Sequence, residues 1–239
     1  MIPARYGSTR FPGKPLAQLT GKFLIQHVVE QAQQSKLANT VVVATDDHRI
    51  FDAVHSFGGH AVMTSDAHHS GTDRIAEVIK RPEYSAVRVV VNVQGDEPDI
   101  DPQHTDQLIT ALSPPLHAPP HPDIPMATAA TPFAHAHDIE NPNYVKVVLD
   151  HRHCALYFSR SVIPFDRDRA AQGTLQAGAG GIYRKHLGMK ILVQDTPHAP
   201  IGVDTPDDYA AFVRRYHQTL KPASDSSGIS GSDTDRRAS

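Results

Sequence analysis

Two runs of β-branched residues constrain the fold of this 239-residue chain more than any other feature. Residues 40–45 read Thr-Val-Val-Val-Ala-Thr, and residues 87–93 are rich in valine. Continuous runs of this kind are typical of strands that are buried on both faces of a parallel sheet. Apolar residues at helical spacing predict an amphipathic helix over residues 22–35, ahead of the first run. Alternation of such strands with helices predicts a doubly wound, mostly parallel α/β sheet.

Capping residues delimit the other helices of this sheet. Asp46 and Asp47 predict the start of a helix that ends near Gly58 and Gly59, and a brief strand follows over residues 60–64. Ser70-Gly71-Thr72-Asp73 resembles a capping box and predicts a helix through residue 79. Asp101-Pro102 predicts a further helix, with proline at its first position.

The pattern changes after a Pro/His-rich loop at residues 113–125. Strands are predicted over residues 126–131, 144–149, 155–159 and 189–193, with a long loop over 161–179. We therefore divide the chain into an α/β part (1–112), a smaller α+β part (126–220) and a tail (221–239) that we expect to be disordered. Thr205-Pro206 starts a final helix, which we expect to return to the first part.

Composition limits the classes of function. With 39% hydrophobic and 21% charged residues, the chain is expected to form a packed globule. A net charge of −3 argues against general nucleic-acid binding, so an anion site requires a local basic patch. Cys154 is the single cysteine, which excludes an internal disulfide and suits a reducing cytoplasm. The sequence lacks an apolar run near the ~20 residues that a membrane span needs.

A basic loop at residues 3–15 supplies such a patch. Arg5, Arg10 and Lys14 lie among glycine, serine, threonine and proline, directly before a predicted helix. Backbone N–H groups freed at Gly7 and Gly13, together with these cations, could hold a polyphosphate. The loop matches neither a Walker A motif nor the dinucleotide fingerprint. A solvated basic turn is the alternative interpretation.

A second polar segment, Gln94-Gly95-Asp96-Glu97-Pro98, follows the second valine-rich run. Ligands of doubly wound sheets bind beyond the carboxyl ends of the strands, where this segment, the basic loop and residues 45–47 are expected. Asp96 and Glu97 could instead only cap or turn the chain. The histidine pairs 68/69, 135/137 and 151/153 could suggest zinc, but their turn-like contexts and the absence of a Cys/His framework disfavour it.

Eight segments, taken in order, resemble one enzyme family. The matching residues are 2–16, 70–74, 92–98, 141–143 with 145–150, 155–160, 164–169, 185–188 and 202–206. Together they resemble the 3-deoxy-manno-octulosonate cytidylyltransferases (CMP-Kdo synthetases), from residue 2 to about residue 213. The resemblance implies a nucleotide-diphospho-sugar transferase-like fold. It also implies a nucleotidyltransferase that joins CTP to Kdo, giving CMP-Kdo and diphosphate for lipopolysaccharide biosynthesis, and a homodimer.

The resemblance also implies site residues. Arg10 and Lys14 would hold the CTP triphosphate, with the backbone from Ala4 and, more weakly, Arg5. Catalysis would rest on Arg10, Lys14, Asp96 and Asp204, the last two as ligands of Mg²⁺, which prefers carboxylates and phosphate oxygens. The cytosine would lie against Ser70, Gly71 and Arg74, and the sugar acid against Gln94, Arg160, Arg167 and His186. For Arg160 and Arg167, ion pairing with Asp166 and Asp168 is the alternative.

The chain departs from the family pattern at two places. Only Met1 and Ile2 precede Pro3, so the first strand is expected to be short. After Gly188 the chain passes directly to residues 189–193, where family members have a strand and two helices that contribute to the sugar site. Four hypotheses therefore stand: an active Kdo cytidylyltransferase, a relative that binds CTP and Mg²⁺ with impaired transfer, a sialic acid-like cytidylyltransferase, and an interaction protein that uses its exposed lobe and tail.

Overall fold

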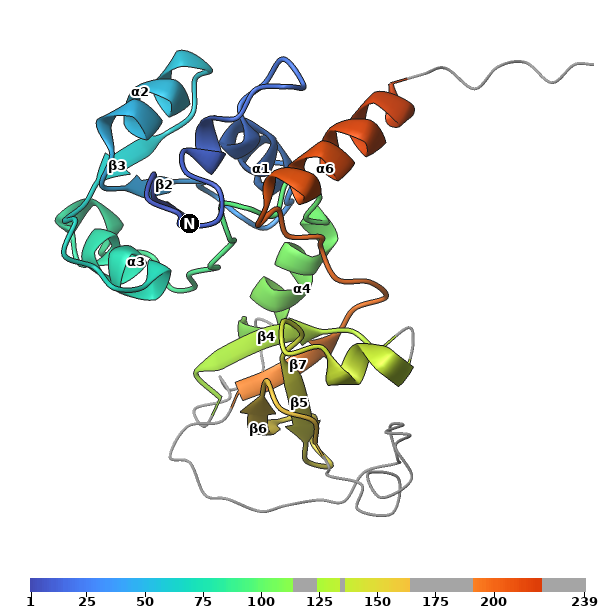
Figure 1. Cartoon of the computed structure of the whole chain (residues 1–239). Coiled ribbons are helices and arrows are strands. Elements are labelled where there is room, and N and C mark those ends of the chain that lie inside the picture. Colours follow the sequence, from blue (N-terminus) through green and yellow to red (C-terminus); the bar gives the residue numbers. More distant parts are fainter. Residues whose placement is uncertain (114–123, 134–135, 164–190, 221–239) are drawn as a thin grey trace, which may run out of the picture.

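The first valine-rich run lies at the centre of a parallel sheet. The computed structural model describes residues 1–113, 124–133, 136–163 and 191–220. Strands β1 (Ile2–Ala4), β2 (Val43–Thr45) and β3 (Ala61–Met63) pair in this order, with Ile2 opposite Val43 and Val43 opposite Ala61. Helices α1 (Leu24–Ala32), α2 (His48–Ser56) and α3 (Gly71–Ile79) surround them (Figure 1). The predicted α/β architecture is confirmed, and β1 is short as expected.

Burial on both sides of β2 accounts for its continuous apolar sequence. Val43 packs into a buried cluster with Ile2 and with residues of α1 and α2 such as Val28 and Val54. Val42 and Ala44 belong to a second buried cluster, which includes residues of α3 and the 3₁₀ turn Pro82–Tyr84. Successive side chains of a strand point to opposite faces, so β2 contributes to both layers of core.

The second valine-rich run does not form a strand, and this prediction was wrong. Within the run, Val87 is 43% exposed and Val90 38% exposed. The run meets the sheet beside Met1, whose terminal amino group donates to the Val91 carbonyl (2.7 Å) and whose carbonyl accepts from the Val93 N–H (3.0 Å). The next residue that faces this side is Pro3, which has no N–H to continue a ladder. The pairing therefore ends after one residue.

A second group of strands follows α4 (Pro102–Leu112), which runs between the two parts in Figure 1. Strands β4 (Met126–Ala130) and β7 (Ile191–Asp195) pair in parallel, and β5 (Lys146–Leu149) and β6 (Ala155–Ser159) form an antiparallel hairpin. A 3₁₀ turn spans Ala136–Glu140. We call residues 124–133, 136–163 and 191–195 the β4–β7 region. Residues 150–153 form the turn between β5 and β6, in which the Asp150 carboxylate accepts hydrogen bonds from the N–H groups of Arg152 and Cys154.

The final helix, α6 (Pro206–Thr219), returns to the first part as expected. Thr205 and Asp208 form a capping box at its start, which satisfies N–H groups that the first turn leaves free. Val203, Tyr209 and Phe212 pack with Leu24 of α1 in a third buried cluster. Among the described residues, no helix has the length and apolar character needed to cross a membrane.

Several predictions fall outside the described residues. These concern most of the loops at 113–125 and 161–179, the tail at 221–239, and the junction at Gly188 where a segment of the family is expected to be missing.

Candidate active site

A hollow of about 380 Å³ opens at the carboxyl end of β1. Four segments line it: the basic loop after β1, residues 68–74 at the start of α3, the segment 94–96, and Asp204 before α6. The predicted binding residues among these are Ala4, Arg5, Arg10, Lys14, Ser70, Gly71, Arg74, Gln94, Asp96 and Asp204. Segments from distant parts of the sequence thus meet where a doubly wound sheet binds its ligand.

Two glycines allow these segments to close around Pro3. A Cβ atom at Gly95 would lie 2.8 Å from the Pro3 carbonyl oxygen, and one at Gly71 would lie 2.9 Å from the Pro3 ring. Glycine at these two positions therefore lets residues 94–96 and the start of α3 lie directly against β1.

Two carboxylates converge on one ammonium group in this hollow. The Lys14 Nζ lies 2.8 Å from Asp96 Oδ2 and 3.5 Å from Asp204 Oδ1, and the Lys14 side chain is only 11% exposed. The Arg10 guanidinium, which is more exposed, lies 3.0 Å from Asp204 Oδ1. The carboxylates thus face a single position of positive charge. Two hard oxygen donors on one cation position form a set that suits Mg²⁺, so the residues fit the predicted metal.

Backbone contacts hold the two carboxylates together. The Val203 N–H donates to the Asp96 carbonyl at 2.8 Å, and Val203 is fully buried between α1 and α6. The N–H of Asp204 donates to the Asp208 carboxylate at 3.1 Å. The pKa of Asp208 is lowered, mainly by the hydrogen bond from the Thr205 side chain. Packing of α6 on α1 therefore sets the position of Asp204 relative to Asp96.

The two neighbouring acids of the segment 94–98 have different environments. Asp96 lines the hollow, whereas Glu97 is not among the lining residues. Burial, and secondly the charge of Asp96, raise the pKa of Glu97 to about 7. Of these two acids, only Asp96, which was predicted to hold Mg²⁺ together with Asp204, therefore lies at the hollow.

The start of α3 forms another wall of the hollow. Ser70 caps the helix by accepting a hydrogen bond from the Asp73 N–H. Arg74 is buried, and its guanidinium donates to Asp46 Oδ2 (2.6 Å) and Thr64 Oγ1 (2.5 Å). Because these partners fix the Arg74 side chain, it shapes the wall. The polar segment 45–47 thus acts on the site indirectly, because Asp46 binds the Arg74 side chain that lines the hollow.

The lining residues and the predicted site residues overlap only in part. His68 and His69 line the hollow, although the sequence suggested only a disfavoured zinc pair. Their position directly before Ser70 was the available signal. Of the four predicted sugar-binding residues, Gln94 lines the hollow. Arg160 does not: it is exposed after β6 and donates to the Pro142 carbonyl at 2.9 Å. Arg167 and His186 lie outside the described residues.

Comparison with known proteins gives consistent matches over most of the chain. A family model described as "Cytidylyltransferase" matches residues 1–221. The 3-deoxy-manno-octulosonate cytidylyltransferase of Idiomarina loihiensis is 50% identical over 216 residues, which cover 90% of this chain and 76% of that protein. The corresponding protein of Trichlorobacter lovleyi is 41% identical, over 91% of this chain and 98% of its own length. A solved CMP:2-keto-3-deoxy-manno-octonic acid synthetase complexed with CTP is 33% identical and superposes with a TM-score of 0.74, covering 92% of this chain and 98% of that one.

The length of one alignment bears on the predicted internal departure. The match to the Trichlorobacter lovleyi protein runs over 255 residues, which exceeds the 239 residues of this chain. That relative therefore contains residues with no counterpart here. This agrees with an absent segment, and its placement after Gly188 stays a prediction.

Proposed function

Because this chain belongs to the 3-deoxy-manno-octulosonate cytidylyltransferase family, we propose that the hollow after β1 binds CTP for transfer of its cytidylyl group to Kdo. Kdo is 3-deoxy-D-manno-octulosonate. The oxygen of its anomeric hydroxyl bonds to the α-phosphorus and gives its proton to water. The bond between the α-phosphorus and the oxygen that bridges it to the β-phosphate breaks, and diphosphate leaves as CMP-Kdo forms. The observation that carries the proposal is the convergence of Asp96 and Asp204 on the Lys14 ammonium.

The basic loop supplies the charge that a triphosphate needs. Lys14 is nearly buried against Asp96, while Arg5 and Arg10 are exposed at the rim, Arg10 in an ion pair with Asp204. A guanidinium can bind two phosphate oxygens at once, and an ammonium acts as a point charge. Lys14 and Arg10 would exchange their present carboxylate partners for phosphate oxygens when the nucleotide binds. This arrangement positions the α-phosphorus and offsets the charge on the leaving diphosphate.

Asp96 and Asp204 would hold Mg²⁺ beside the triphosphate, through one oxygen or more from each carboxylate. Bound there, the metal would neutralise phosphate charge and lower the pKa of the attacking hydroxyl. The nucleobase end would lie against Ser70 and Gly71, in a wall that Arg74 keeps in shape.

One observation favours a second candidate, a protein that binds CTP with impaired transfer. Gln94 lies in the hollow, but Arg160 is bound to the Pro142 carbonyl away from it. Binding of Kdo by Arg160, Arg167 and His186 stays a prediction. A sugar acid that lacks these partners would be oriented poorly, which costs rate as well as affinity.

The test combines diphosphate release with direct CTP binding. Wild type, Asp96→Asn and the matched control Asp99→Asn are each incubated with CTP, Mg²⁺ and Kdo. Asp99 pairs with Arg215 at 2.6 Å and does not line the hollow. We expect release by the wild type and the control, and a loss of at least about 100-fold in Asp96→Asn. Normal Mg²⁺-dependent release by Asp96→Asn would overturn the proposal, whereas CTP binding by the wild type without release would support the second candidate.

A further inference from the structure

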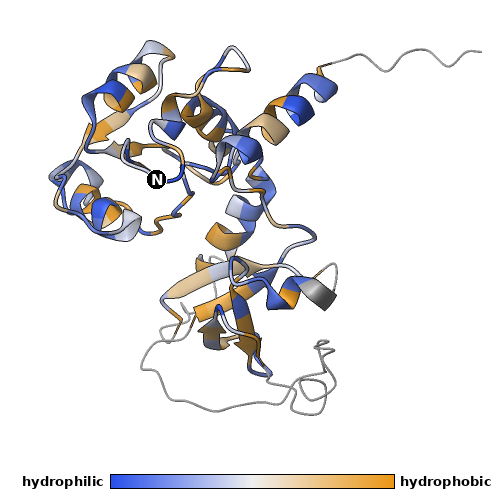
Figure 2. Ribbon diagram, viewed as in Figure 1, coloured by the Kyte–Doolittle hydropathy of each residue, from blue (hydrophilic) through white to orange (hydrophobic). Residues whose placement is uncertain are grey.

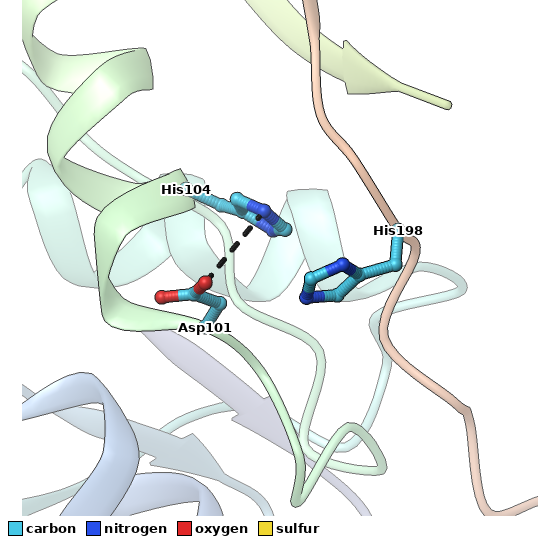
Figure 3. Close-up of side chains that lie close together, drawn as sticks. All are labelled: Asp101, His104 and His198. Atoms are coloured by element: carbon cyan, nitrogen blue, oxygen red, sulfur yellow. Dashed lines mark ion pairs between the residues drawn. The ribbon is translucent and has the colours of Figure 1, made fainter. Parts of the chain in front are cut away.

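Three potential metal ligands meet at the start of α4, outside the hollow. Asp101 is the residue that caps this helix, His104 lies in its first turn, and His198 comes from the segment between β7 and α6 (Figure 3). One ligand atom from each residue lies within 4.8 Å of the other two. The histidines are far apart in the sequence, and their rings lie side by side with centroids 5.7 Å apart and planes tilted by 55°.

The His104 side chain is the unusual member of this group. It is only 7% exposed, and its Nε2 is a buried atom with no hydrogen-bond partner among the described residues. The nearest charged oxygen, Asp101 Oδ2, is 3.9 Å away, which is too far for a hydrogen bond. A buried polar atom without a partner is costly, and such atoms call for a ligand or another explanation. Figure 3 shows the His104 ring turned toward Asp101 and His198.

The other two residues are placed to complete a site. Asp101 caps α4 through Oδ1, which accepts a hydrogen bond from the Gln103 N–H at 2.8 Å. This contact orients the carboxylate and leaves Oδ2 on the side of His104. His198 is exposed and lies on a connecting segment, so its ring can move with little cost. Orientation of a ligand by a second hydrogen bond is a regular feature of protein metal sites.

We propose that Asp101, His104 and His198 bind Zn²⁺. Two imidazole nitrogens and one carboxylate oxygen are a donor set that zinc favours, and three protein ligands leave a fourth position for water. Ligand atoms of a tetrahedral zinc site are about 3.4 Å apart, so the present separations close through a small movement of His198. The imidazoles distinguish this site from the all-oxygen pair Asp96 and Asp204, which suits Mg²⁺.

Zinc at this position would fasten two segments that lead to the hollow. His198 lies on the segment that carries Asp204, and Asp101 follows the segment that carries Asp96. The hydrogen bond from Val203 to Asp96 joins the same two segments at the other end. The ion would therefore act as a structural clip that restrains Asp204 relative to α4.

The test is zinc binding by the full, untagged chain after treatment with EDTA. Zinc and cobalt are titrated in the presence of millimolar Mg²⁺, which occupies oxygen-only sites. His198→Ala removes an exposed ligand and is expected to fold normally. Asp101→Asn keeps the capping oxygen, and His60→Ala is the matched control because His60 is exposed and distant in sequence from all three ligands.

We expect one zinc per chain in the wild type and in His60→Ala, with the visible absorption of tetrahedral Co²⁺. Zinc affinity should fall at least about 100-fold in His198→Ala and about 10-fold or more in Asp101→Asn. Saturating zinc should raise Tm by about 5 °C in the wild type and leave His198→Ala unchanged. Absence of zinc binding by the wild type, or equal zinc affinity in His198→Ala, would overturn the proposal. Neither result depends on diphosphate release, so the inference is tested separately from the proposed function.

Discussion

The sheet of β1–β3 and the β4–β7 region bury their apolar residues very differently. Around β1–β3, strand residues such as Ile2 and Val43 are fully buried and belong to continuous clusters. In the β4–β7 region, Tyr157 is 54% exposed, Tyr144 50% and Met126 47%. Figure 2 shows apolar strands in both parts, so the difference lies in their covering and not in their hydropathy. The residues proposed to hold the triphosphate therefore rest on a packed core, and the predicted sugar-binding residue Arg160 does not.

Polar contacts replace apolar packing in part of the β4–β7 region. The Lys146 side chain is buried at the start of β5, and its ammonium donates to the carbonyls of Asn141 (3.1 Å), Tyr144 (3.0 Å) and Arg160 (2.6 Å). These bonds hold the loop before β5 to the end of β6. Hydrogen bonds of this kind fix the local geometry, but they contribute less to the free energy of folding than burial of an apolar layer of the same size.

Replacement of Lys14 should have the largest effect on activity. It tests the proposed role of the residues that lie against the β1–β3 sheet, without a contribution from the β4–β7 region. In Lys14→Met, we expect kcat/KM to fall about 100- to 1000-fold, because the ammonium that faces both carboxylates is lost. Steady-state diphosphate release measures the change. Lys22→Met is the control, since Lys22 forms an exposed ion pair with Glu30. A fall of less than about threefold in Lys14→Met would mean that Lys14 does not serve the reaction.

A pair of matched core substitutions tests the comparison directly. Val43→Ala should lower the free energy of unfolding by about 2 kcal/mol, because Val43 is fully buried between α1 and α2. Val147→Ala on β5, where the side chain is half-buried, should cost less than about 1 kcal/mol. Urea denaturation measures both. Equal losses would show that the two regions are packed alike.

Replacement of Arg160 would sharpen the contrast at the sugar end. If the family-implied role applies, Arg160→Gln raises the KM for Kdo about 10-fold and leaves the KM for CTP unchanged, because one charge-assisted contact is lost. The control is Arg152→Gln, in the exposed turn between β5 and β6. Unchanged KM for Kdo would indicate that the bond to the Pro142 carbonyl persists in the working protein, with Arg160 serving only the hairpin.

The smallest expected effect concerns Asp106 of α4, the helix that connects the β1–β3 sheet to the β4–β7 region. Burial alone would raise the pKa of Asp106 on α4, but hydrogen bonds from Ser35, Lys36 and Leu37 outweigh it and lower the pKa below its ordinary value. The folded state therefore binds a proton less readily than the unfolded state. The stabilisation is present above the ordinary pKa of about 3.9 and is lost as the pH falls through the lower folded value.

Asp106→Asn tests the contribution of these hydrogen bonds. We expect it to lower the free energy of unfolding at pH 7 by less than about 1 kcal/mol, since the group is partly solvated. It should also reduce the loss of stability between pH 5 and pH 3, as measured by denaturation at each pH. Asp52→Asn, on the exposed side of α2, is the control. An identical pH dependence in Asp106→Asn and the wild type would contradict the assignment.

Local sequence patterns were sufficient for most elements of the fold. Asp47, Ser70, Asp101 and Thr205 each cap the helix that they were predicted to start, because a cap depends on residues within one turn. The valine run of β2 indicated burial on two faces, and motifs of the basic loop indicated residues that line the hollow. These features depend on the chemistry of neighbouring residues, which any single sequence contains.

Only the tertiary structure decided which distant groups meet. Residues 87–93 have the composition of a strand, but Pro3 on the neighbouring segment ends their pairing. The meeting of Asp96 with Asp204 depends on the packing of Val203 between α1 and α6. No sequence pattern indicated that His104 and His198 meet, because they are far apart in the chain and are brought together only by the course of the chain through β7. Contacts of this kind require many buried interactions to offset the entropy of closing long loops, so the sequence alone determined the elements and the packed chain determined the sites.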